Sequence, residues 1–239
     1  MYAWLEQEIA QRFSPVQQLK RSPRGTVELL RHKETGQLVI CRRFSGNGEV
    51  YRQLRALSSP NLAKVLEAVE QDGQVIVLEE YVSGDTLETL LREKLFSPRE
   101  AAEIGRQICE GLYPLHTMGL VHRDIKPSNV VLRDGHAVLI DFDAARIHRA
   151  DGGGDTQVLG TVGYAAPEQF GLSESDARSD IYALGVLINC LVTGAHPSVK
   201  LTGGRIGRIV TKCTMTERGR RYSDVLRLRD ALQGGAVWT

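Results

Sequence analysis

The spacing of apolar positions changes once along the chain. From about residue 16 to residue 82 the apolar residues form short β-branched and aromatic runs separated by turn residues, which favours strands. After residue 82 they recur at intervals of three and four, which favours helices. The pattern therefore predicts an α+β fold with two lobes, a small β-rich N-lobe and a larger, mostly helical C-lobe.

The first part contains two predicted hairpins with a helix between them. Their turns fall at residues 35–36 (Thr-Gly) and 72–73 (Asp-Gly), and Asp-Gly is a strong hairpin turn signal. The segment between the hairpins, residues 49–57, has helical spacing. A further short helix is predicted at the N-terminus, over residues 3–13.

The second part opens with two capping-box patterns, which begin at Asp85 and Ser97. The second has proline at the first helical position, which favours a helix start. One apolar stripe follows along this predicted helix, which ends at Gly119: Ile104, Ile108, Leu112 and Leu115.

Three more features complete the predicted C-lobe. A hairpin should turn at residues 134–135 (Asp-Gly). Residues 181–193 are apolar almost all round, which predicts a helix buried on every side. Two further helices are predicted near residues 205–214 and 223–232. With the N-lobe over residues 1–82, we expect a single domain spanning 1–239.

Composition is that of an ordinary globular protein, with 42% hydrophobic and 25% charged residues and a formal net charge of +1. So small a net charge predicts neither a nucleic-acid nor a membrane partner. The four cysteines form no C-x-x-C pair, so neither a zinc site nor a disulfide framework is indicated.

The ends of the chain give two further expectations. No apolar run reaches about 18 residues and the N-terminus lacks a signal-peptide pattern, so a cytoplasmic location is expected. Residues 234–239 (GGAVWT) resemble the start of a linker, which suggests a further domain after residue 239.

The candidate chemistry lies in residues 120–132, "LVHRDIKPSNVVL". Asp124, Lys126 and Asn129 are closely spaced there, and Asp141 follows the next apolar strand. These side chains suit phosphoryl transfer, in which a protein orients the nucleophile and neutralises charge through carboxylates, an amide, a cation and Mg²⁺.

This spacing resembles the protein kinase family, and more closely its bacterial serine/threonine branch, over about residues 13–232. Residues 160–170, "GTVGYAAPEQF", resemble the family's substrate-binding segment, which ends at Glu168. By the same resemblance Asp180 in "SDIYALG" anchors the catalytic loop, and Arg221 in "ERGRRY" pairs with Glu168.

The resemblance implies a role for each polar residue of the loop. Asp124 is the general base, and Lys126 contacts the transferred phosphate. Asn129 and Asp141 bind Mg²⁺. Thr161 bridges Asp124 and Lys126, a feature of serine/threonine rather than tyrosine kinases. ATP and Mg²⁺ are therefore the expected cofactors.

The glycine-rich loop of the family is largely missing. In "KRSPRGTV", residues 20–27, only Gly25 and Val27 match the pattern, and Pro23 removes one N–H donor. The loop is basic instead, and its cations either contact phosphate or form a solvated charge run: Lys20, Arg21 and Arg24.

The N-lobe also departs from the family at its phosphate-binding cation. Counting from Gly25 places Arg42 where the family has lysine, a swap that is not conservative. The helix glutamate that normally pairs with this cation is displaced, because Glu49 lies one position off. Glu79 occupies a position at the back of the nucleotide pocket that is usually apolar. We therefore predict that Arg42 pairs with Glu79.

The remaining nucleotide contacts are also implied by the resemblance. Glu80 and Val82 supply backbone contacts to adenine, and Val27 and Val131 sandwich the ring. Ile40 replaces a small residue over adenine, which would narrow the pocket.

The segment after Asp141 carries two open questions. Asp143 stands where the family has glycine, and aspartate tolerates left-handed backbone angles better than most residues. Two interpretations of Asp143 therefore remain open: a purely structural substitution, or an added carboxylate near Mg²⁺. Thr156 falls near the family's regulatory phosphate site, with Arg123 as the expected partner, although a plain flexible loop explains it equally.

Three functions are consistent with these residues. The first is an ATP-dependent kinase that phosphorylates serine or threonine in a protein or peptide. The second is a pseudokinase, a binding module whose altered N-lobe no longer supports turnover. The third, a small-molecule phosphotransferase, fits less well, because residues 160–170 resemble a peptide-binding segment. The intact residues of the C-lobe favour the enzyme.

Overall fold

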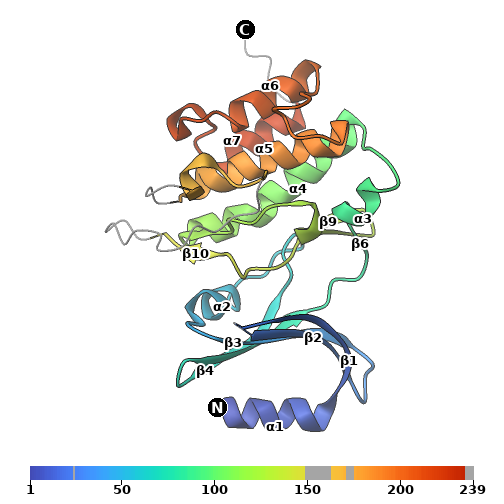
Figure 1. The fold of residues 1–239 in the computed structure, drawn as a ribbon, viewed down its shortest axis with the longest axis vertical. Coiled ribbons are helices and arrows are strands. Elements are labelled where there is room, and N and C mark those ends of the chain that lie inside the picture. The colour runs from blue at the N-terminus through green and yellow to red at the C-terminus, as the bar shows by residue number, and fades with distance from the viewer. Residues whose placement is uncertain (24, 149–162, 171–174, 235–239) are drawn as a thin grey trace. The chain divides into compact units, whose positions relative to one another are not determined.

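The computed structural model describes residues 1–23, 25–148, 163–170 and 175–234 (Figure 1). It divides into two compact units, which are described separately below. Unit 1 contains residues 1–59 and 63–82, and unit 2 contains residues 60–62 and 83–239. The division at residue 82 matches the change in apolar spacing, but residues 60–62 group with the second unit rather than the first.

Unit 1 is built on a five-stranded antiparallel sheet with strand order β1-β2-β3-β5-β4 (Figure 1). The strands are β1 Phe13–Ser22, β2 Gly25–His32, β3 Leu38–Ser45, β4 Val65–Gln71 and β5 Gln74–Glu80. The central position of β3, between β2 and β5, fixes the neighbours of every residue on it.

The predicted hairpin turns are confirmed by the backbone angles. Asp72 and Gly73 have φ of 51° and 71° between β4 and β5, and Gly36 has φ of 72° between β2 and β3. Two consecutive left-handed residues define the turn type whose twist matches that of the flanking strands. Asp-Gly therefore sets the β4–β5 register, in which Gln71 pairs with Gln74.

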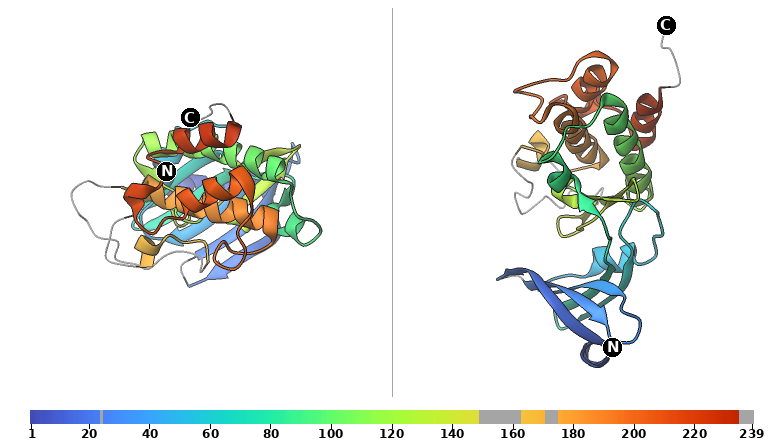
Figure 2. Two further views of the ribbon diagram at one scale, coloured as in Figure 1. Left: turned by 90° about the horizontal axis from the view of Figure 1, so that it is seen from above. Right: turned by 90° about the vertical axis from the view of Figure 1, so that its right-hand side faces the viewer.

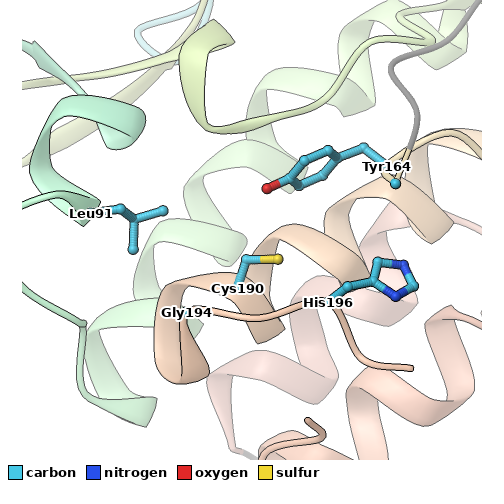
Figure 3. A pocket seen from close by; sticks show the side chains of 6 residues that line it. Leu91, Tyr164, Cys190, Gly194 and His196 are labelled. Atoms are coloured by element: carbon cyan, nitrogen blue, oxygen red, sulfur yellow. The ribbon is translucent and has the colours of Figure 1, made fainter. Parts of the chain in front are cut away.

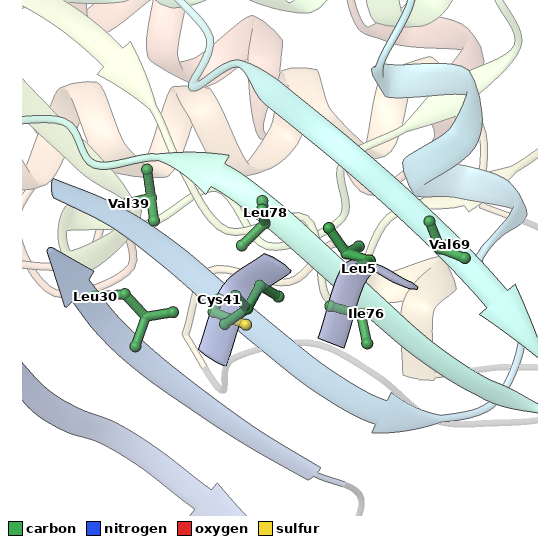
Figure 4. Close-up of a cluster of buried hydrophobic side chains, with 8 residues drawn as sticks. Leu5, Leu30, Val39, Cys41, Val69, Ile76 and Leu78 are labelled. Carbon is green, nitrogen blue, oxygen red and sulfur yellow. The ribbon is translucent and has the colours of Figure 1, made fainter. Parts of the chain in front are cut away.

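One face of the sheet is covered by helix α1, Tyr2–Arg12, which confirms the predicted N-terminal helix. Apolar side chains of α1 and the sheet form a buried cluster (Figure 4): Leu5, Ile9, Leu30, Val39, Cys41, Val69, Ile76 and Leu78. At the edge of the cluster Arg43 Nε lies 3.0 Å from Glu6 Oε1 on α1, and Arg43 Nη1 lies 2.6 Å from Glu28 Oε2. The helix is thus an integral part of unit 1.

Among the helices of unit 2, α5, Ala177–Thr193, is buried along most of its length, which confirms the prediction for residues 181–193. The others are α3 Leu87–Leu91, α4 Pro98–Thr117, α6 Gly204–Cys213 and α7 Val225–Gln233. Helix α4 packs against α5 and α7 (green, orange and red in Figure 2). A Cβ at Gly105 would lie 2.8 Å from Ile188 Cδ1 and 3.1 Å from Leu232 Cδ1, so glycine permits this close packing.

The starts of α3 and α4 follow capping chemistry, with one correction to the predicted residues. Ser97 and Glu100 form the predicted reciprocal capping box of α4, with contacts of 2.8 and 3.2 Å. The cap of α3 is Thr86, whose Oγ1 accepts from Thr89 N at 3.1 Å. The predicted cap, Asp85, lies instead in strand β6, where it pairs with Leu132.

Short strands in unit 2 hold the loops that carry the candidate chemistry. One sheet has the order β6-β8-β9 and another pairs β7 with β10. Their bounds are β6 Asp85–Thr86, β7 Leu120–Val121, β8 Val130–Arg133, β9 His136–Leu139 and β10 Arg146–Ile147. The predicted turn between β8 and β9 is confirmed at Asp134 and Gly135, with φ of 50° and 80°.

Candidate active site

The loop between β7 and β8 brings three predicted site residues together. Lys126 Nζ lies 2.8 Å from Asp124 Oδ2. Asn129 Nδ2 donates to the same carboxylate oxygen and to the Asp124 carbonyl, both at 2.9 Å. A cation and an amide therefore hold the Asp124 carboxylate from two sides, which fixes its orientation and stabilises its negative charge.

Asp180 anchors this loop by its backbone, as the resemblance implied. Its carboxylate is fully buried and accepts the N–H groups of His122 and Arg123 at 2.9 and 2.8 Å. Arg123 has φ of 69°, a left-handed angle that a non-glycine residue holds only when its surroundings impose it. The two hydrogen bonds thus secure a strained turn directly before Asp124.

A third partner completes the Asp180 anchor. His116 Nε2 lies 2.8 Å from Asp180 Oδ2. Burial alone would raise the pKa of Asp180, but the contact with His116 is the largest of several interactions that hold that pKa below its usual value. The carboxylate is therefore an ionised acceptor in the interior of unit 2.

The segment that begins at Asp141 follows β9 directly. Ile140 N donates to the Asn129 carbonyl at 2.9 Å, so the strand end and the catalytic loop are joined. The rings of His122 and Phe142 pack edge to face with centroids 5.5 Å apart. Burial lowers the pKa of His122, so this ring is neutral.

The backbone angle expected at Asp143 falls on a different residue. Among the described residues, the left-handed aspartate of this segment is Asp141, with φ of 66°, and Asp143 is not in that region. Asp143 has an exposed side chain, and its N–H donates to Asp141 Oδ1 at 3.2 Å. The turn needs a backbone N–H at position 143, which aspartate supplies as well as glycine does.

The donor set of this site fits Mg²⁺. The Asn129 amide nitrogen is fixed by Asp124, so the orientation of the amide oxygen is also fixed. The Asp141 carboxylate follows the strand joined to Asn129. Carboxylate and amide oxygens are hard ligands of the kind that Mg²⁺ prefers.

In unit 1 the predicted pair of Arg42 and Glu79 is confirmed. Arg42 Nε donates to Glu79 Oε2, and the two side chains are only 9% and 4% exposed. The ladder pairs Ile40 with Glu79 and Val27 with Arg42, so these four residues share the face of the sheet opposite α1. The predicted phosphate-binding cation and adenine contacts of unit 1 therefore lie on one surface.

The other predicted nucleotide contacts lie at strand ends. Glu80 is the last residue of β5, and its N–H donates to the Lys64 carbonyl at 2.8 Å. Val82 is buried at the end of unit 1, and Val131 is buried on β8 in unit 2.

Gly25 has a structural reason to be glycine. A Cβ at this position would lie 2.0 Å from the Arg43 carbonyl oxygen, so the contact between β2 and β3 excludes any side chain. Lys20 and Arg21 are exposed on β1, and Arg24 lies outside the described residues. Close packing of β2 on β3 is therefore sufficient to require glycine at this position.

The end of the predicted substrate-binding segment is held by a buried ion pair. Arg221 Nη1 and Nη2 donate to Glu168 Oε1 and Oε2 at 2.7 and 2.9 Å, as the resemblance implied. Burial alone would raise the pKa of Glu168, but the Arg221 and Ser179 hydrogen bonds hold it below its usual value. Thr156 and Thr161 lie outside the described residues.

Two residues of this network, Gln169 and His116, were not predicted from the sequence. Gln169 Nε2 donates to the Arg123 carbonyl at 3.0 Å, and its Oε1 accepts from Ala166 N at 3.0 Å, which joins the segment to the catalytic loop. His116 resembled an ordinary residue of the last turn of α4. Its spacing of six residues before His122 was a usable signal only within the family pattern.

A separate pocket of about 240 Å³ lies in unit 2, beside the start of this segment (Figure 3). Burial raises the pKa values of the Tyr164 hydroxyl and the Cys190 thiol, so both are neutral. None of the predicted catalytic residues lines the pocket, which is formed by Leu91, Gly163, Tyr164, Cys190, Gly194 and His196.

Taken together, the sheet unit, the helical unit and the anchored Asp-Lys-Asn loop define a protein of the kinase class. A sequence model described as "Protein kinase domain" matches residues 22–224. The chain belongs to the protein kinase domain family. Helix α1 and most of β1 precede the matched residues.

Bacterial serine/threonine kinases are among the curated relatives. A probable serine/threonine-protein kinase of Clostridium perfringens is 34% identical over 64% of this chain and 24% of its own length. Serine/threonine-protein kinase pkn2 of Myxococcus xanthus is 30% identical over 76% of this chain and 22% of its own. PknD of Mycobacterium tuberculosis is 31% identical over 80% of this chain and 31% of its own.

The chain thus spans about a quarter to a third of the length of these relatives. Within the described ranges, no helix is both long enough and apolar enough to span a membrane.

Proposed function

We propose that this chain is an ATP-dependent serine/threonine protein kinase that uses Mg²⁺. The observation that carries the proposal is the joined set of Asp124, Lys126 and Asn129 on a loop anchored by Asp180. A fold kept only for binding does not need this arrangement, because a strained turn and three convergent polar groups contribute little to packing. The names of the bacterial relatives support the same activity.

In the proposed reaction the substrate hydroxyl attacks the γ-phosphorus of ATP. The hydroxyl proton passes to Asp124, and the bond from the γ-phosphorus to the β–γ bridging oxygen breaks, which releases ADP. Lys126 neutralises charge on the transferred phosphoryl group. Asn129 and Asp141 would hold Mg²⁺, which would supply positive charge to the triphosphate when bound.

The nucleotide contacts complete the proposal. Arg42 meets the phosphates from unit 1, and the carbonyl of Glu80 and the backbone of Val82 bind adenine. Further candidates line the ring or the phosphates: Gly25, Val27, Ile40 and Val131. A serine or threonine in a protein or peptide is the proposed acceptor, and the cytoplasm, where ATP is available, is the proposed location.

The test is transfer of labelled phosphate from MgATP to a protein substrate or to the chain itself, with Thr156 examined by mass spectrometry. Asp124→Asn should lower the rate by at least about a hundredfold, because it removes the general base without changing shape. Asp134→Asn is the matched control, since asparagine suits the left-handed turn there and the rate should stay unchanged.

Equal rates for wild type and Asp124→Asn would reject the assignment of Asp124. MgATP binding without any transfer would favour the pseudokinase, and transfer to a small molecule alone would favour the third function.

A further inference from the structure

The Arg42–Glu79 pair raises the question of what holds the proposed phosphate-binding cation in place. In protein kinases a cation on this strand must be paired with a glutamate on the neighbouring helix, and movement of that helix controls activity. In this chain the cation is Arg42 on β3 and the helix is α2, Glu49–Leu54.

Polar groups at and next to the start of α2 contact the edge strand β4. Gly48 N and Arg52 Nη1 both meet Glu70 Oε2, at 3.0 and 2.7 Å. Strand β5 lies between β4 and β3 in the sheet, and β5 carries Glu79. The rings of Tyr51 on α2 and Phe44 on β3 also meet, with centroids 5.8 Å apart.

Glu79 reaches Arg42 across one step of the β3–β5 ladder. Ile40 pairs directly with Glu79, and Arg42 is two residues along the same strand, so the pair is a diagonal on one face. Both side chains are nearly inaccessible to solvent. A buried guanidinium held by a carboxylate on the adjacent strand has little freedom to leave its position.

We propose that Glu79 is the positioning residue of Arg42 and takes the place of the helix glutamate. The sheet itself then fixes the cation, so its position does not depend on α2. Because a guanidinium carries five N–H donors in a planar fork, it can hold Glu79 and a phosphate oxygen at once, which a lysine does less readily. This accounts for arginine and glutamate occurring together at these positions, and it rests on the proposed function.

The consequence is a kinase whose nucleotide affinity is set within the sheet. Displacement of α2 should leave the phosphate contact of Arg42 intact, whereas loss of the Glu79 charge should weaken it. The acid on α2, Glu49, should have no part in nucleotide binding.

The experiment measures the dissociation constants of MgATP and of adenosine by titration calorimetry for wild type, Glu79→Gln, Arg42→Gln and the double variant. Each single change should raise the ATP constant about tenfold, which corresponds to about 1.4 kcal/mol. The double variant should bind ATP no more weakly than either single variant, because each single change already breaks the Arg42–Glu79 pair. The dissociation constant for adenosine should stay within about twofold of the wild-type value, since Arg42 contacts phosphate and adenosine has none. A general collapse of the site would weaken the binding of both ligands.

Glu49→Gln is the matched control, and its ATP constant should equal that of wild type. Glu79→Asp is a second variant in case the glutamine variant does not fold, since it keeps the charge but shortens the side chain by one methylene. It should weaken the binding of ATP and leave the binding of adenosine unchanged.

Three results would overturn the positioning role. The first is an unchanged ATP affinity in both Glu79 variants, and the second is a loss of ATP affinity in the double variant equal to the product of the two single losses. The third is a loss of ATP affinity in Glu49→Gln as large as that in Glu79→Gln. Failure of the wild type to bind MgATP would instead reject the proposed function. The two failures are thus distinguished by the wild-type titration.

Discussion

Removal of Arg221 should destabilise unit 2 strongly, although the residue lies in an irregular loop. Its side chain is fully buried and that of Glu168 is 6% exposed. Besides the two bonds to Glu168, its guanidinium donates to three carbonyls, those of Met215, Thr216 and Arg178, at 2.7, 3.2 and 3.0 Å. All five donors are therefore used, as a buried arginine requires.

Replacement by methionine keeps much of the volume but leaves the Glu168 carboxylate buried without its cation. Breaking a buried pair in this way costs about 3–5 kcal/mol. For a protein of this size each kcal/mol lowers the melting temperature by about 2–4 °C, so Arg221→Met should melt roughly 6–20 °C below wild type. Circular dichroism at 222 nm suits the measurement, because unit 2 holds most of the helix.

The neighbouring Arg220 supplies the control. Its pair with Glu217 is exposed, with both side chains 68% accessible, and such pairs contribute less than about 1 kcal/mol. Arg220→Met should therefore melt within a few degrees of wild type. Similar melting temperatures for the two variants would refute the view that the buried pair holds this loop.

At acid pH the melting temperatures of wild type and Arg221→Met should lie closer together than at neutral pH. The folded pKa of Glu168 is lowered, so the stability that this group contributes is present above the ordinary glutamate value of about 4.5 and is lost as the pH falls through the folded pKa. In the variant, protonation of Glu168 also relieves the uncompensated charge. The gap in melting temperature should thus be smaller at pH 4 than at pH 7, and a gap independent of pH would contradict this account.

Three further outcomes follow from single side chains. Ile9→Ala should cost about 2–5 kcal/mol and speed hydrogen exchange in β3 and β5, because Ile9 lies in the buried cluster under α1; unchanged exchange would mean that α1 is dispensable. Ser97→Ala should lower the unfolding free energy by about 1 kcal/mol in urea titration, through loss of the α4 capping box, whereas Ser14→Ala, which removes one exposed 3.4 Å hydrogen bond, should cost less. The pKa of His122 is lowered by burial, so wild-type stability should decline as the pH falls below about 6.5, where only the unfolded chain binds the proton. His122→Phe should decline less over pH 7 to 5, and equal slopes would contradict the buried neutral ring.

Much of the fold follows from short-range patterns. Asp-Gly at residues 72–73 and 134–135 predicts hairpin turns because two left-handed residues in succession are needed there. The α4 helix is predicted by its capping box and its apolar stripe, because each pattern is formed by residues only three or four positions apart in the sequence. The start of α3 shows the limit: the capping-box spacing predicted Asp85 as the cap, whereas the next residue, Thr86, caps the helix.

The candidate site divides in the same way. Sequence alone predicted the candidate site, because Asp124, Lys126 and Asn129 lie within six positions of one another. A charge at each of two unusual positions likewise predicted the pair of Arg42 and Glu79, which the structure confirms. Only the tertiary structure decided what fixes them: His116 on Asp180 across 64 residues, and the left-handed angle at Asp141. The physical reason is range, since backbone preferences act over a few residues, whereas buried hydrogen bonds depend on which distant segments the core brings into contact.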